Sequence, residues 1–244
     1  MGLFNRAKPI VSSEQLDWLI EHYDWLEDRV QFPDEGVPLV RPTEDYFTRP
    51  PTEGHERAEH IFNEVRDLMG MSEWRCRLSA QAEDANPVVG DLLIVQNVPN
   101  SPLGTFRVEP KSNDNVVVTY NPSEISNPYS LIATFAHELS HYLLHNCFSD
   151  RPRRDTDEEC LTDLLAIASG FGLFLADSRF QFSQFQGVTN QGWQTKGAGY
   201  LSEREIITAL ALFLSRNDIE ATEAKPYLKP HLWKLLKRAM AALG

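Results

Sequence analysis

The first part of the chain predicts two amphipathic helices with a proline-rich segment between them. Residues 12–30 carry apolar side chains at helical spacing, and Ser12 or Ser13 supplies the start signal. Five prolines then interrupt residues 31–52, so we expect a linker or a strap that lies on the surface. A second helix is expected from about Glu53 to Met69. Its inward side chains should be Ala58, Ile61, Phe62, Val65 and Leu68.

The pattern changes between Trp74 and Tyr120, where short apolar runs alternate with Asn, Pro, Gly and Asp. Runs of this length that are bounded by turn residues are typical of β-strands, so we predict three or four strands. The predicted strands are Arg75–Ala80, Asp91–Val98, Thr105–Val108 and Val116–Tyr120.

A helix that bears His137 and His141 is predicted over residues 131–145. On a helical wheel its apolar side chains lie opposite the histidines, so the back of the helix can be buried while the front stays polar. Asn127 and Pro128 supply a cap and a first-turn proline. The apolar face consists of Ile132, Phe135, Ala136, Leu139, Tyr142 and Leu143.

Further helices are predicted after a polar loop over residues 149–156. The next helix runs from about Asp157 to Leu175 and is apolar almost all round. A capping box formed by Ser202 and Glu205 begins another helix, which continues through Leu214. The last helix covers Lys225 to Leu243, with a break near Pro230.

Residues 178–199 form a long segment without an acidic side chain. Four aromatic residues lie in it among Gln, Asn, Gly and Ser. A segment of this kind is either a lid that faces the substrate or a plug that covers apolar surface, and both interpretations stay open.

Length and charge limit the class of protein. The 244 residues, 42% of them hydrophobic, suffice for one domain or for a domain with a helical appendage. We expect residues 1–52 to form an N-terminal helix and proline-rich strap, and residues 53–244 to form one compact domain. The net charge of −12 argues against a nucleic-acid partner. A basic cluster near the C-terminus is interpreted as a solvated helix face.

Cysteine usage and hydropathy predict a cytoplasmic protein without a membrane partner. Three cysteines at unrelated spacings offer neither a disulfide framework nor a CxxC metal site, as is usual in a reducing cytosol. The N-terminus lacks the apolar core of a signal peptide. The longest apolar run, Leu164 to Ala176, is too short to span a bilayer. The cysteines are Cys76, Cys147 and Cys160.

The predicted histidine helix carries the strongest chemical signal in the chain, His137-Glu138-x-x-His141. Four residues are about 1.1 helical turns, so the two imidazoles point the same way and can offer two nitrogens to one tetrahedral metal ion. Glu138 is offset by about 100°, beside the metal rather than on it. Its carboxylate can there accept a proton from a water whose pKa zinc has lowered.

Acidic residues on the following helix can complete the metal site. Glu159 and Asp163 are one turn apart on the same face. One carboxylate there would be the third protein ligand, leaving the fourth position to water. The other would accept the spare ring N–H of a liganding histidine and so fix its tautomer.

These motifs resemble those of the gluzincin metallopeptidases. In that family two histidines and a downstream glutamate hold zinc, and an aspartate one turn later orients a histidine. The extended form, with His145 one turn beyond His141, is also similar to small cytosolic bacterial metallopeptidases that cleave phage repressors and other transcription regulators. The resemblance covers about residues 130–176.

The resemblance implies an α+β fold with a zincin-like core. In such a core a small twisted sheet packs on the histidine helix and the glutamate helix, and this chain would add helices at both ends. His137, His141 and Glu159 would bind Zn²⁺. Glu138 would act as general base and then as proton donor to the leaving amine, while Asp163 orients a histidine. The implied substrate is a protein or peptide.

Two departures from the family pattern leave alternatives open. The Asn that often precedes the third ligand in thermolysin-like enzymes is absent, so Glu158 remains a rival to Glu159. His145 cannot be the distal ligand of a metzincin, because the Gly and His of that motif are missing, and we interpret it as a last-turn cation.

Two further interpretations complete the sequence-based picture. Transition-state stabilisation needs a donor besides zinc, and Tyr200 and His231 are candidates, although neither signal is specific and the sequence favours an ordinary packed aromatic or exposed histidine at each position. The alternative to an enzyme is a catalytically idle, zincin-like binding or regulatory module with a structural metal site. Such a site would recruit Cys147 or Cys160 as its fourth ligand.

Overall fold

The computed structural model describes residues 8–50, 53–81, 104–108, 116–147, 158–178 and 200–243. Three predicted features lie outside this described part. They are the strand Asp91–Val98, the polar loop over residues 149–156 and all but the first residue of the segment 178–199.

The two N-terminal helices form where the apolar spacing predicts them. Helix α1 spans Ser13–Glu27, and the Ser12 side chain accepts the Gln15 N–H at 3.2 Å while the Gln15 side chain accepts the Ser12 N–H at 2.9 Å. This reciprocal pair is a capping box, so Ser12 is the start signal. Helix α2 spans His55–Leu68 and buries every predicted inward side chain except Leu68, which is half-buried.

The sheet has three strands in the order β1-β3-β2. They are Cys76–Ala80 (β1), Gly104–Val108 (β2) and Val116–Tyr120 (β3). β1 pairs with β3 in parallel, with Cys76 opposite Val116, and β2 pairs with β3 antiparallel, with Gly104 opposite Tyr120. The central strand β3 is buried at Val116, Val117, Val118 and Tyr120, which explains why every residue but Thr119 is apolar or aromatic. Three of the four predicted strands are therefore confirmed.

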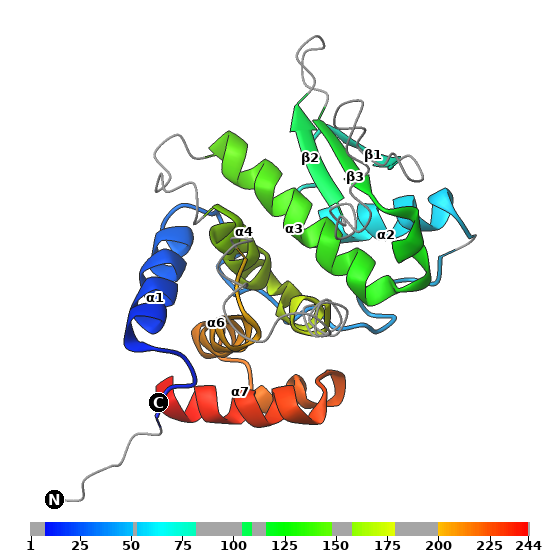
Figure 1. The fold of residues 1–244 in the computed structure, drawn as a ribbon. Helices are drawn as coiled ribbons and strands as arrows, with labels where there is room; N and C mark the ends of the chain where they lie inside the picture. The colour runs from blue at the N-terminus through cyan, green and yellow to red at the C-terminus, as the bar shows by residue number, and fades with distance from the viewer. Residues whose placement is uncertain are drawn as a thin grey trace, which may run out of the picture.

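Helix α3, Pro128–Cys147, lies between the sheet and the helices of the C-terminal half (Figure 1). A 3₁₀ turn, η1 (Pro122–Ser126), precedes it. The Asn127 side-chain oxygen accepts the Ser130 N–H at 3.4 Å, so the predicted cap is present. Because α3 has neighbours on two sides, its burial is wider than the predicted face. Leu144 is buried and Leu143 only half-buried, and Ser140 is buried beside the histidines.

The predicted single helix from Asp157 to Leu175 is interrupted. It consists of α4 (Glu158–Ala166), a π-helical turn, η2 (Ile167–Phe171), and a further helical stretch over 172–178. Gly170 in this turn has φ 95°, a conformation that side chains other than glycine rarely adopt. A Cβ there would also lie 2.5 Å from the Pro38 carbonyl oxygen. Both constraints reserve the position for glycine.

The proline-rich segment packs against this turn and is not purely a surface strap. The Val40 N–H donates to the Gly170 carbonyl at 3.1 Å, and the Val37 N–H donates to the Asn217 side chain at 2.7 Å. Leu39 and Val40 are 3% and 1% exposed, so the expectation of a surface strap was wrong at these positions. The close approach that Gly170 permits lets the strap contribute to the core.

The stretch Glu158–Ser178 is, by length and composition alone, apolar enough to cross a membrane, with a mean hydropathy of 1.5 over the tested window. However, 89% of that window is buried inside the protein. Helices α3, α6 and α1 contact α4, and α6 also contacts η2. The stretch is therefore a buried core helix of the described structure.

The C-terminal helices close the other side of the core. Helix α6 spans Glu203–Arg216 and begins with the predicted capping box of Ser202 and Glu205. Two 3₁₀ turns, η4 (Ala221–Glu223) and η5 (Lys225–Tyr227), lead to α7 (Pro230–Leu243), which packs on α6. Helix α1 also packs on α6, and Arg216 pairs with Glu27 at 3.0 Å. The described elements thus form a helix-rich fold with one small sheet, compatible with the α+β class.

Candidate metal centre

Three side chains from two neighbouring helices meet at one point. His137 and His141 extend from α3, and Glu159 extends from the first turn of α4. The Glu159 Oε2 atom lies 3.1 Å from His137 Nε2 and 3.4 Å from His141 Nε2. One donor atom of each residue lies within 4.8 Å of the others. We call these residues the His-His-Glu group.

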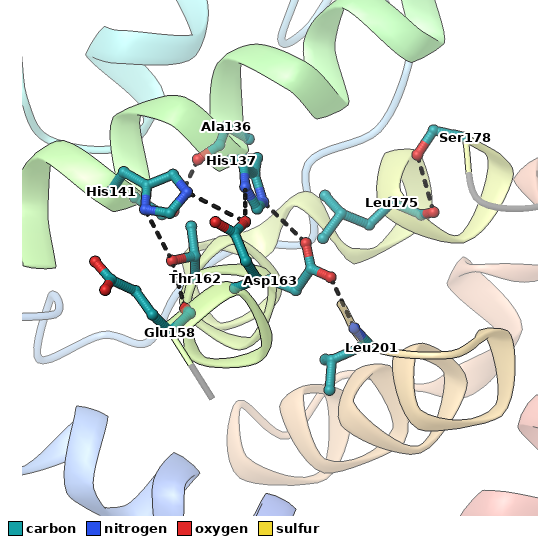
Figure 2. A network of polar contacts seen from close by, with 11 residues as sticks. Ala136, His137, His141, Glu158, Thr162, Asp163, Leu175, Ser178 and Leu201 are labelled. Carbon is teal, nitrogen blue, oxygen red and sulfur yellow. Dashed lines mark hydrogen bonds and ion pairs between the residues drawn. The ribbon is translucent and has the colours of Figure 1, made fainter. Parts of the chain in front are cut away.

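The opposite edge of each imidazole also has a partner, and both partners come from α4 (Figure 2). His137 Nδ1 lies 2.9 Å from Asp163 Oδ1, and His141 Nδ1 lies 3.3 Å from Thr162 Oγ1. An aspartate oxygen accepts hydrogen bonds, so Nδ1 of His137 is the donor. In the neutral tautomer this leaves the Nε2 lone pair directed toward Glu159.

Asp163 also links the group to the segment before α6. Its second oxygen, Oδ2, accepts the Leu201 N–H at 3.1 Å, and the residue is 2% exposed. Leu201 is followed directly by Ser202, the cap of α6. One buried carboxylate therefore fixes both the His137 ring and the start of α6.

The donor set could hold a metal ion. Two imidazole nitrogens and one carboxylate oxygen converge, and zinc binds all three kinds of donor. Within the part of the chain that the structure describes, no fourth His, Cys, Asp or Glu joins the group. Three protein ligands and an open fourth position characterise catalytic rather than structural zinc sites.

The protonation of the cation-free group shows how strongly the charges interact. Burial alone would lower the pKa of His137, but hydrogen bonds with Asp163 and Glu159 and the nearby negative charges raise it to about 10. Burial would raise the pKa of Glu159, yet hydrogen bonds with His137 and His141 and their charges hold it well below its usual range. A proton on His137 thus balances the carboxylates where a cation would, so cation binding must displace it.

Glu138 lies beside the group but outside it. Its side chain is 6% exposed, and burial raises the pKa of its carboxyl, partly offset by the charges of His137 and His141. A carboxylate with a raised pKa is a better proton acceptor than one in water. The position and the basicity both suit a general base.

The two acidic candidates for the third ligand differ in placement. Glu159 reaches both histidines, whereas Glu158 is exposed and its side chain extends away from them (Figure 2). The backbone carbonyl of Glu158, however, accepts the Thr162 hydroxyl at 2.8 Å. The geometry therefore favours Glu159 as the ligand, as the sequence-based interpretation did.

The two candidate transition-state donors lie in different surroundings. The Tyr200 ring is 5.5 Å from the His137 ring between centroids, and it directly precedes the anchored Leu201. His231 lies in the first turn of α7, where its side chain is 43% exposed and its Nε2 is 3.4 Å from Glu203. The described contacts thus bring Tyr200, and not His231, to the His-His-Glu group.

Two other candidates from the sequence lie away from the donor atoms. His145 is exposed in the last turn of α3, as predicted, and is not part of the His-His-Glu group. Cys160 is half-buried on α4 and does not join the group either. The side chain of Cys147 lies outside the described part of the chain.

Sequence reasoning missed Thr162. The sequence feature that could have identified Thr162 is its position on the helix. It follows Glu159 by three residues and precedes Asp163, so all three lie on one face of α4. A threonine in an apolar helix is otherwise an ordinary core residue, and only its 0% exposure beside His141 reveals the contact.

Comparisons of the chain with models of known protein families, with curated proteins and with solved structures found no match. The gluzincin resemblance therefore stays a prediction from the motif residues.

Replacing Glu159 by glutamine is expected to weaken zinc binding strongly, because the ligand loses its negative charge where it meets both histidines. The loss should exceed the roughly 10–100-fold that removal of a partner outside the ligand shell causes. Glu158→Gln is the matched control, since it makes the same change one residue away and should leave the affinity unchanged. Competition with a chromophoric chelator measures both. A larger effect for Glu158→Gln would make that residue the ligand.

Proposed function

We propose that the protein is a zinc-dependent hydrolase that cleaves peptide bonds in a protein or peptide substrate. One observation carries the proposal. The Nε2 atoms of His137 and His141 meet the Glu159 carboxylate, while buried Glu138 lies beside them. A protein that only needed to join two helices would have no use for a buried, basic carboxylate next to an open site.

The arrangement around this group supports a zincin-like core as part of the proposal. Helix α3 contacts β2 and β3 on one side and α4 on the other. A small sheet, a histidine helix and a glutamate helix in this order are what the gluzincin resemblance implies. A peptide substrate and a cytoplasmic location rest on that resemblance and on the composition of the chain.

In the proposed reaction each side chain has one task. Zinc, when bound, supplies the Lewis acidity that lowers the pKa of water to near neutrality. His137, His141 and Glu159 hold the ion. Glu138 accepts the proton of the attacking water and returns it to the amine that leaves. Asp163 keeps His137 in the tautomer whose Nε2 is free to bind.

Tyr200 is the better supported of the two candidate donors for the transition state. Leu201 is anchored to Asp163, so the residue before it is held next to His137. A phenolic hydroxyl can donate to the oxyanion that forms during amide hydrolysis. We propose this role for Tyr200 and assign none to His231, whose observed partner is Glu203.

The alternative is a binding or regulatory module with a structural metal site. A structural site normally has four protein ligands. Among the described residues the group has three members, and Cys160 is not one of them. This difference favours the hydrolase.

Removal of the metal tests the proposed function. Zinc-loaded protein, incubated with a heat-inactivated proteome extract, is expected to generate new peptide N-termini that mass spectrometry detects. Chelator-stripped protein should generate none, and added zinc should restore them, because water activation needs the ion. Heat inactivation removes the extract's own proteases. Termini that persist without metal would contradict zinc catalysis, and their absence with zinc bound would favour another substrate class or the binding module.

A further inference from the structure

Helix α4 supplies more than a ligand to the His-His-Glu group. Glu159, Thr162 and Asp163 lie on one face of this helix, and each contacts a histidine of α3. Asp163 has the role that the sequence predicts. The sequence predicts no role for Thr162, although this residue is fully buried against His141.

We infer that Thr162 is a positioning residue that fixes the tautomer and the ring orientation of His141. This inference deepens the proposed function and rests on the metal centre proposed there. It makes α4 the element that orients both liganding imidazoles, His137 through Asp163 and His141 through Thr162. Glu159 on the same helix then completes the ligand set.

The direction of the hydrogen bond between Thr162 and His141 depends on which acceptor receives the Thr162 hydroxyl proton. A hydroxyl has one proton to donate and two lone pairs to accept with. Thr162 Oγ1 is 2.8 Å from the Glu158 carbonyl, which can only accept, so the proton is committed there. Toward His141 the hydroxyl oxygen can therefore only accept.

The consequence for His141 concerns both ring nitrogens. Its Nδ1 atom, 3.3 Å from Thr162 Oγ1, must carry the proton. Neutral imidazole has one proton, so Nε2 is then left with its lone pair. That lone pair faces Glu159, where the ion would bind. Thr162 thus selects the tautomer that can bind a metal, as Asp163 does for His137.

A partner of this kind also restricts rotation of the ring. Thr162 is 0% exposed, and other helices pack against α4 on several sides. Water cannot easily replace a buried acceptor, so the His141 Nδ1–H would lose its partner if the hydroxyl were removed. The expected result is a less ordered ring and a weaker site.

The chain contains a matched control for this role. Thr208 on α6 is also buried, at 3% exposed, and its hydroxyl donates to the Arg204 carbonyl at 2.8 Å. Thr162 and Thr208 therefore make the same bond to the carbonyl four residues earlier. Thr208 is not among the residues that contact the His-His-Glu group. Valine at either position removes the same helical bond, but only at 162 does it remove a partner of a ligand.

The test compares zinc affinity in Thr162→Val, Thr162→Ser and Thr208→Val. Competition with a chromophoric chelator is expected to give a dissociation constant about 10–100-fold higher than wild type for Thr162→Val. Thr162→Ser keeps the hydroxyl and should bind within about threefold of wild type, as should Thr208→Val. Circular dichroism verifies that each variant is folded, and Thr162→Ala replaces Thr162→Val if the valine does not fold.

A second measurement follows the hydrogen bond itself in the zinc-loaded protein. The Nδ1–H proton of His141 should give a slowly exchanging NMR signal in wild type and in Thr162→Ser, and a broadened or absent signal in Thr162→Val. Unchanged affinity in Thr162→Val, or an equal loss in Thr208→Val, overturns the role of Thr162 while the metal centre stands. A folded wild type that binds no zinc overturns the metal centre and this inference with it.

Discussion

Replacing His137 or His141 by alanine is expected to abolish zinc binding. Purified wild-type protein should hold roughly one zinc ion per chain, and each variant should hold almost none after gel filtration. The reason is that a site with three protein ligands keeps only two when one imidazole is lost. Metal analysis by mass spectrometry measures the content directly.

His145→Ala is the matched control for this experiment. It removes the same kind of side chain from the same helix, one turn beyond His141, and His145 is exposed and outside the His-His-Glu group. We expect it to keep its zinc. Because His137→Ala also leaves the buried Asp163 without its ring partner, each variant must first be shown to be folded. Stoichiometric zinc in both folded variants would disprove the site.

The local half of this site could be predicted from the sequence because it depends on one helix. Two histidines four residues apart share a face wherever the helix forms, and the apolar spacing of α3 predicts the helix. The position of Glu138 beside the two histidines can be predicted from the same rotation per residue along the helix. Capping boxes at Ser12 and Ser202 fix helix starts by equally local hydrogen bonds. The box at Ser202 was predicted as such, whereas for the first helix only a start signal at Ser12 or Ser13 was predicted.

The half of the site that α4 contributes depends on how α4 packs against α3, which no local sequence pattern predicts. Glu158 and Glu159 are neighbours about 100° apart on a helix, so only the packing of α4 on α3 decides which one faces the histidines. Thr162 was missed for the same reason. Its chemistry appears only when His141, from another helix, is placed against it.

The kink in the apolar helix also depends on long-range contacts. The sequence-based prediction was one continuous helix from about Asp157 to Leu175, which runs through Gly170 without a break. In the fold Gly170 contacts Pro38 and Val40, which lie far earlier in the chain. Proline spacing predicted an irregular segment there, but it could not show that Leu39 and Val40 would be buried.

The general base separates an enzyme from a structural metal site. Glu138→Gln keeps the size of the side chain but removes its ability to accept a proton. In a hydrolase this change should lower turnover by about 10²–10⁴-fold while zinc content stays at the wild-type level. In a structural site it should change almost nothing, because Glu138 is not one of the three residues of the His-His-Glu group.

Burial adds a second expected effect of the same substitution. Burial raises the pKa of the Glu138 carboxyl, which means that its charged form is costly in the folded protein. Neutral glutamine does not carry that cost, so Glu138→Gln should be at least as stable as wild type in thermal unfolding. Lost turnover with stability retained cannot then be attributed to unfolding.

The measurement compares zinc-loaded wild type and Glu138→Gln on the same heat-inactivated proteome extract, counting peptide N-termini that depend on the wild-type protein. Glu73→Gln is a suitable control, because Glu73 is exposed and lies just before β1. This substitution changes the net charge by the same amount as Glu138→Gln. Equal numbers of new termini from wild type and Glu138→Gln would remove Glu138 from the mechanism. If neither generates termini although both hold zinc, the proposal of a peptidase fails and a binding module or a different hydrolase takes its place.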